Sequence, residues 1–220
     1  MPASPSLSLL EARVVGVLVE KERTVPDSYP LTLNALVAGC NQKTSRDPVI
    51  EASEAEVQGA IDRLKSLSMV VESSGGRVSR YTHNAGKVLG IPPQSMALLA
   101  VLFLRGPQTA GELRINSERL HRFGDILSVE AFLRELAERR DGPLVRELPR
   151  VAGAREARWM HLLSGEPDES PAQAGDTSAG DAISMSEMAT LRAKVDALER
   201  EVASLRETVS RLSRELGITT

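Results

Sequence analysis

The sequence contains few of the residues on which many functional sites depend. Aromatic side chains make up 3% of its 220 residues, and it has one cysteine. So few aromatics argue against a surface on which nucleic-acid bases stack. A lone cysteine excludes a disulfide within the chain and fits a reducing compartment. Together with three separated histidines it matches no metal-ligand spacing, so we expect no metal or other cofactor.

Long apolar runs are also lacking. The longest, MALLAVLFL at residues 96 to 104, has nine residues, whereas a helix that spans a bilayer needs about 20. The N-terminal stretch VVGVLV is short and follows Glu11 and Arg13, which does not fit a signal-peptide core. We therefore expect a cytoplasmic protein that does not contact a membrane.

No set of catalytic residues can be recognised. The sequence SSGG at residues 73 to 76 is not followed by the Gly-Lys-Ser/Thr of a phosphate loop. The paired acids SEAE and ERRD fit helix starts and solvated helix faces, and no second element places an acid opposite a base. We expect a protein that is not an enzyme.

The net charge of −3 is distributed unevenly. Residues 1 to 163 carry 21 Lys and Arg against 19 Asp and Glu, and residues 184 to 220 carry six of each kind. Residues 164 to 183 carry five acids and no base, in a stretch rich in Gly, Pro and Ser. Such a composition offers little apolar surface to bury, so we predict a disordered acidic linker over residues 164 to 183.

The chain before this linker nearly repeats itself. Three pairs of equivalent positions, Thr32 and Thr109, Ser53 and Ser128, and Val70 and Val145, are separated by 77, 75 and 75 residues. In the first copy, apolar residues recur at helical spacing from residue 9 to 21, after Thr32 and after Ser53, and two short β-branched runs follow. The second copy has the same order, with helices at 93 to 104, after Thr109 and after Ser128.

Three helices followed by a two-stranded hairpin is the order of a winged helix. We therefore predict a mainly α fold with small β wings (α+β), in which two winged-helix domains, residues 1 to 88 and 89 to 163, follow one another. Because residues 96 to 104 are apolar on every side, we expect this helix to pack against both copies and to join them rigidly.

The segment GCNQKTSRDPV, residues 39 to 49, connects the second and third helices of the first copy. Cys40 continues the apolar stripe of the second helix, where a thiol is a small buried side chain. Asn41 and Gln42 are suited to cap that helix, and the Asp-Pro pair indicates a turn. The connection is long for a helix-turn-helix, so we predict a contact loop that presents Lys43 and Arg46.

Residues 184 to 217 have apolar side chains in alternating steps of three and four, which is the heptad pattern of a coiled coil. Leu at every d position with mostly Val at a favours a two-stranded parallel dimer, although the flanking charges also permit an antiparallel one. The alternative is a single long helix that folds back on its own chain. The predicted dimerisation seam comprises Met188, Leu191, Val195, Leu198, Val202, Leu205, Val209, Leu212 and Leu216.

Several of these stretches carry a family resemblance. LEARVVGVLVEKE, the CNQK segment, SEAEVQGAIDRL, VLFLRGPQTAGELR and REARWMHL closely resemble the YceH family of bacterial proteins. The resemblance covers residues 7 to 164. It implies a tandem winged-helix fold, but no biochemical function, because members of the family have none assigned.

Two kinds of function remain open, and the fold itself favours the first. A winged helix commonly binds duplex DNA, and a dimeric regulator or architectural protein would present four of them. Alternatively, the winged helices bind another protein, as in the segregation and condensation protein B, which this arrangement resembles in outline. Acids at the start of the third helices, Glu54 and Glu56 in the first copy, favour the second reading. The candidate nucleic-acid contacts are Lys43, Arg46, Arg77, Arg80, Arg114, Arg119, Arg122, Arg150, Arg155 and Arg158.

Overall fold

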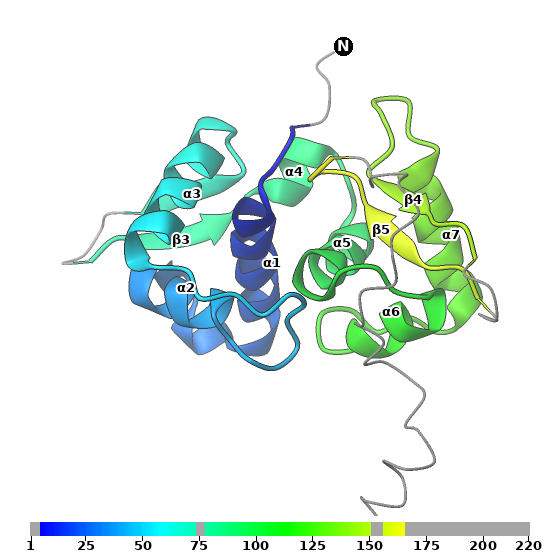
Figure 1. Ribbon diagram of the computed structural model, residues 1–220, viewed down its shortest axis with the longest axis horizontal. Coiled ribbons are helices and arrows are strands. Elements are labelled where there is room, and N and C mark those ends of the chain that lie inside the picture. Colours follow the sequence, from blue (N-terminus) through cyan, green and yellow to red (C-terminus); the bar gives the residue numbers. More distant parts are fainter. Residues whose placement is uncertain (1–4, 74–77, 151–155, 166–220) are drawn as a thin grey trace, which may run out of the picture. The chain divides into compact units, whose positions relative to one another are not determined.

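A computed structural model describes residues 5–73, 78–150 and 156–165, which belong to one compact unit, Met1–Pro167 (Figure 1). No helix in these ranges is both long and apolar enough to span a membrane. The predicted coiled-coil helix, and the predicted linker from residue 166 on, lie outside the described residues. So do Arg77 and Arg155.

The first half of the compact unit has three helices and a small antiparallel sheet. The strand order is β1-β3-β2, with Val70 opposite His83 and Leu31 opposite Tyr81. A short 3-10 helix, Pro26–Ser28, precedes the first strand. The elements are α1 (Leu9–Thr24), β1 (Leu31–Thr32), α2 (Leu33–Cys40), α3 (Glu54–Ser66), β2 (Val70–Ser73) and β3 (Arg80–His83).

The second half repeats this order of elements. β4 and β5 form a two-stranded antiparallel sheet, and Gln108 bridges to Trp159 at the place where β1 joins the first sheet. A short helix that the sequence analysis did not predict, α4 (Ala85–Leu89), connects the halves. The remaining elements are α5 (Pro93–Arg105), α6 (Ala110–Asn116), α7 (Ile126–Ala137), β4 (Val145–Glu147) and β5 (Trp159–His161).

Capping residues explain where the helices begin. Thr32, Ser53 and Thr109, after which the sequence predicts helices, each accept a hydrogen bond from a backbone N–H of the first turn. The predicted start at Ser128 is wrong, because α7 begins two residues earlier. Asp125 is its cap, and Asp125 and Ser128 form a reciprocal capping box.

One hydrophobic core runs through both halves. Residues 95 to 104 of α5 are all buried, as expected for a helix that is apolar on every side, and α5 packs closely on α1. A Cβ atom placed on Gly16 of α1 would lie 2.9 Å from Cγ of Leu104, so glycine permits this close approach. The fold is mainly helical with small antiparallel sheets, which is consistent with winged-helix architecture. The predicted boundary at residue 88 stays a prediction, since the described residues form one unit.

Candidate functional site

The loop from Asn41 to Ala52, here called the junction loop, is held in place by a buried arginine of α1. Arg13 has no exposed surface. Its Nη1 donates to the carbonyl oxygen of Cys40 at 3.1 Å, and its Nη2 donates to that of Pro48 at 2.7 Å. Burial, and next the neighbouring charge of Arg46, lower the pKa of Arg13. The guanidinium therefore satisfies carbonyl groups at the end of α2 and in the middle of the loop.

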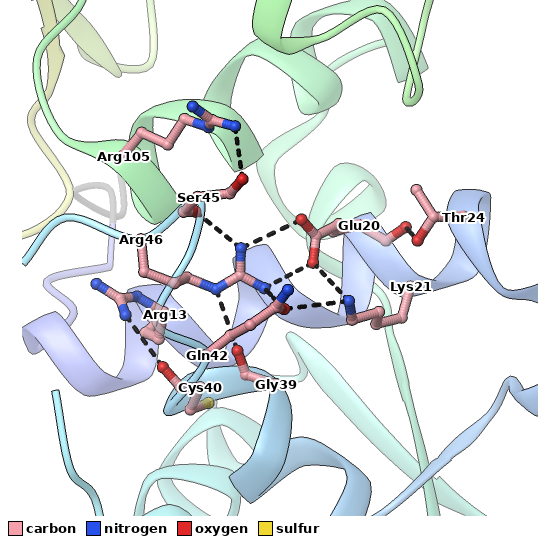
Figure 2. Close-up of polar contacts among 10 residues, drawn as sticks. All are labelled: Arg13, Glu20, Lys21, Thr24, Gly39, Cys40, Gln42, Ser45, Arg46 and Arg105. Carbon is pink, nitrogen blue, oxygen red and sulfur yellow. Dashed lines mark hydrogen bonds and ion pairs between the residues drawn. The ribbon is translucent and has the colours of Figure 1, made fainter. Parts of the chain in front are cut away.

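Arg46 is the second anchor of the junction loop (Figure 2). Its side chain is buried, and its Nη2 lies 2.6 Å from Oε2 of Glu20. The same guanidinium donates to the carbonyl oxygen of Gly39 and to Oε1 of Gln42. Arg46 is thus not the exposed nucleic-acid contact that the sequence predicts. Its charge is neutralised inside the fold by Glu20.

The acid of this pair is held in its charged form. Burial alone would raise the pKa of Glu20, but the hydrogen bonds and charge of Arg46, assisted by Lys21, lower it below its usual value. Lys21 Nζ lies 3.1 Å from the same carboxylate. Glu20 therefore remains ionised at neutral pH and serves as the partner of Arg46.

The junction loop also contacts the second half of the molecule. The N–H of Asp47 donates to the carbonyl oxygen of Leu104 at 2.8 Å. Figure 2 shows the second contact, in which Arg105 Nη2 donates to Oγ of Ser45 at 2.7 Å. At the far end of the loop, the side-chain amide of Asn41 exchanges two hydrogen bonds with the backbone of Ala52. Asn41 thus closes the loop, whereas the sequence predicts that its side chain caps α2. The loop links α2, α1 and α5.

Cys40 is a core residue, as the sequence indicates. It has no exposed surface and no disulfide partner. Burial raises the pKa of its thiol to about 11, although Arg13 and Arg46 oppose this. At neutral pH the group is a thiol, and a thiol is a poor nucleophile.

The remaining candidate cations occupy separate surface positions. Arg80 donates to the carbonyl oxygen of Pro30, and Arg114 donates to that of Gly124. Arg158 pairs with Glu112 at 3.2 Å. These contacts leave part of each guanidinium exposed. The exposed candidates in the described residues are Lys43, Arg80, Arg114, Arg119, Arg122, Arg150 and Arg158.

The third helix of each half has no cation in its N-terminal part. There is no Lys or Arg at residues 54 to 62 of α3 or at 126 to 133 of α7. On α3 the exposed residues there include Glu54 and Glu56, and the amide of Gln58 is bonded to Asp62. This part of the surface is acidic.

Three large apolar side chains are exposed on α6 and at the start of α7, two helices that contact each other. The exposed fractions are 71% for Ile115, 72% for Leu127 and 42% for Ile126. Arg114 lies close to Ile126, because its guanidinium donates a hydrogen bond to the carbonyl oxygen of Gly124. The pKa of Asp125 is lowered mainly by hydrogen bonds from Ser128, and the charge of Arg114 lowers it further. We call Ile115, Ile126 and Leu127 the α6–α7 patch. Large exposed apolar side chains on neighbouring elements are a feature of interaction surfaces.

A cleft of about 670 Å³ lies between the end of α1, the α4 segment and the start of α5. Val19, Met96 and Ala97 contribute apolar surface to it, while His83 and Lys87 contribute polar groups. Nε2 of His83 lies 3.1 Å from Oε2 of Glu22. Sequence reasoning did not find this cleft, because its walls come from segments about 70 residues apart.

The described residues contain no group of three His, Cys, Asp or Glu side chains arranged to hold a metal ion. Sequence reasoning also missed Arg13 and Glu20 as partners of the junction loop. One signal was present, because Arg13 falls at helical spacing with Leu10 and Val17, and a charge on the apolar face of a helix needs a buried partner.

Comparison with known proteins assigns the chain to a family. A family model described as "Protein of unknown function, DUF480" matches residues 7–154. A UPF0502 protein of Dechloromonas aromatica (strain RCB) is 62% identical over 213 residues, covering 97% of this chain and 99% of the relative. A UPF0502 protein of Leptothrix cholodnii is 59% identical over 215 residues, covering 96% of each chain. The chain therefore belongs to the DUF480 family of UPF0502 proteins, in agreement with the YceH resemblance of its sequence.

Proposed function

We propose that this protein is a non-enzymatic interaction protein, built from two winged-helix units, whose partner is another protein. The observation that carries the proposal is the absence of Lys and Arg from the N-terminal parts of α3 and α7. In helix-turn-helix proteins that read DNA, these parts of the third helix contact base edges in the major groove. Arg, Lys, Asn and Gln supply most of those contacts.

The charges on α3 act against binding to DNA. Glu54 and Glu56 would face phosphates, and their carboxylates would be repelled by them. The pKa of Glu56 is lowered by its hydrogen bonds with Ser53, so its charge persists at neutral pH. Acidic side chains at this position suit a partner with exposed basic groups.

The α6–α7 patch supports the same proposal from the second unit. Beside the phosphates of DNA, Leu127 and Ile115 would stay hydrated and would contribute little to binding. Burial of these two side chains against an apolar partner surface would instead stabilise the complex. Apolar side chains at the centre and charged side chains at the rim are the usual arrangement of a protein interface. With Arg114 beside the patch, its partner segment should carry apolar side chains next to acids.

A pull-down from cell extract tests this proposal, with and without nuclease treatment, using wild type and the double variant Ile115→Ser/Leu127→Ser. Proteins captured by wild type should remain after nuclease treatment and be lost with the double variant. The matched control is Val25→Ser/Val71→Ser, which removes two side chains that are 41% and 47% exposed elsewhere on the surface. Capture that disappears with nuclease, or that survives in the double variant, would contradict the proposal.

A second candidate is a DNA-binding dimer that holds phosphates without reading bases. The exposure of Lys43, Arg119, Arg122 and Arg150 favours it, since such cations neutralise phosphates and release counterions. A C-terminal coiled coil would double the number of contacts. This candidate predicts binding that is independent of sequence and falls steeply with salt, and it is weakened when Arg119 and Arg122 are changed to Gln.

A further inference from the structure

The cleft beside α4 has the size and lining of a site for a small molecule. Its volume of about 670 Å³ lies inside the range of about 300 to 1,000 Å³ that is common for such sites. The apolar part of its wall includes Val19 of α1, Met96 and Ala97 of α5, and Leu120. A ligand that fills it would need an apolar body.

The polar part of the wall is rich in cations. Lys87 and Arg23 are both exposed at the cleft. Glu22 is the acid of this wall, and it already lies 3.1 Å from Nε2 of His83 and 3.9 Å from Nε of Arg23. Lys87 has no ion-pair partner among residues 5–73, 78–150 and 156–165. One positive charge is therefore available to a ligand.

His83 adds a polar group that its surroundings leave unsatisfied. Its side chain is 13% exposed and lines the cleft, and its Nδ1 is buried without a hydrogen-bond partner in the described part of the chain. Buried polar atoms usually have a partner. Because Nδ1 has almost no exposed surface, a bound molecule would reach it only after the imidazole ring turns toward the cleft.

From these observations we propose that the cleft binds a small organic anion with an apolar body, such as an amphipathic carboxylate or sulfonate. The apolar body would lie against Met96 and Ala97, and the anionic group would lie near Lys87. Because α1 forms one wall and α4 and α5 form the other, a bound ligand would link the two halves of the unit and stabilise their packing. This inference goes beyond the proposed function and does not depend on it.

Gly86 offers a way to fill the cleft without disturbing the fold. It lies in α4 and lines the cleft, and a Cβ atom there would meet only ordinary contacts, at 3.7 Å from the carbonyl oxygen of Ile91 and 3.9 Å from Met96. Gly86→Leu should therefore occupy part of the cleft. The matched control is Gly59→Leu, since Gly59 is also helical and a Cβ atom there meets nothing within 4 Å.

The test is a fluorescence titration of the full chain with 1-anilinonaphthalene-8-sulfonate, which is anionic, and with its uncharged analogue N-phenyl-1-naphthylamine. Saturable binding of the sulfonate should be lost in Gly86→Leu and kept in Gly59→Leu. Lys87→Gln should weaken the affinity for the sulfonate by about tenfold, which is the effect of losing one charge-assisted contact. The affinity for the uncharged probe should not change. Lys43→Gln, at an exposed lysine that does not line the cleft, should change neither.

Three results would overturn the inference. The first is a wild-type chain that does not bind the sulfonate saturably. The second is a Gly86→Leu variant that binds the sulfonate as tightly as wild type does. The third is a Lys87→Gln variant in which the affinities for the two probes fall equally. Circular dichroism of each variant confirms that it is folded. A rise in the melting temperature of wild type with the sulfonate, absent in Gly86→Leu, would be the second supporting readout.

Discussion

Arg46 and Glu20 form a largely buried ion pair, in which removal of one charge would destabilise the fold. The side chain of Arg46 has no exposed surface, and that of Glu20 is 16% exposed, so water cannot take the place of Glu20 beside the guanidinium of Arg46 without rearrangement of the loop. Breaking a buried ion pair leaves an uncompensated charge, whereas a pair at the surface contributes little. The junction loop therefore depends on Glu20 for its position.

We predict that Glu20→Ala lowers the free energy of unfolding by on the order of 3 kcal/mol, as measured by urea denaturation. The control is Glu130→Ala, which removes the acid from an exposed helical pair with Arg134. This change should cost less than about 1 kcal/mol. Equal losses in the two variants would show that the Arg46 pair is not the anchor of the loop.

His161 gives a second prediction at the scale of one residue. Its ring packs edge-on against Phe103, with ring centroids 4.8 Å apart, and burial lowers its pKa from 6.5 to about 4. The unfolded chain therefore binds a proton that the folded chain does not between these two pH values. Stability is fully present above pH 6.5 and falls as the pH decreases toward 4.

The free energy of unfolding should fall by about 2 kcal/mol between pH 6.5 and 4.5 because of His161. Urea denaturation at a series of pH values measures this change. His161→Phe removes the titrating group, so its stability should change less over the same interval. A variant with the same pH dependence as wild type would contradict the assignment to His161.

At the scale of helices and strands, two glycines determine how closely α1 can approach its neighbours. A Cβ atom on Gly39 of α2 would lie 2.6 Å from Cγ1 of Val17, and one on Gly16 would lie 2.9 Å from Cγ of Leu104. Gly39→Ala and Gly16→Ala should each lower the free energy of unfolding by about 1 to 3 kcal/mol, the usual cost of overpacking.

The matched control is Gly59→Ala, in which the new methyl group meets no neighbour. Alanine is the better helix former, so this variant should gain up to about 1 kcal/mol. Thermal denaturation of the three variants measures the difference. A stabilising Gly39→Ala would mean that α1 and α2 are not as close as described.

The same elements show which features could be predicted from the sequence. Caps at Thr32, Ser53 and Thr109 depend on contacts within one helical turn, so local sequence is sufficient. The start of α7 was misplaced because Asp125 and Ser128 both suit a cap, and the choice depends on the backbone before the helix.

The junction loop could not be predicted in the same way. Arg46 appeared to be a surface cation because its partner Glu20 is 26 residues away, on another helix. The cleft was missed for the same reason. Contacts between distant segments are determined by packing, which periodicity in one segment does not show.

At the scale of the whole molecule, the C-terminal heptads predict a homodimer. Relatives align with 96% to 99% of this chain, so the alignments extend into the heptad region. Light scattering during size-exclusion chromatography should give twice the mass of one chain. Leu198→Asp/Leu205→Asp, which places charges at two d positions, should give the mass of one chain. A wild-type monomer would contradict this prediction.

The most direct test of the central claim, that the partner of this protein is another protein and not duplex DNA, is a fluorescence anisotropy titration of a random-sequence duplex with the full chain at about 50 mM salt. We predict no saturable binding up to about 100 μM, because nonspecific binders already bind in this range at physiological salt. The positive control is Glu54→Lys/Glu56→Lys, which gives α3 the charges of a DNA-binding helix and should bind more tightly than wild type. Saturable binding by wild type that weakens as salt is raised would contradict the account.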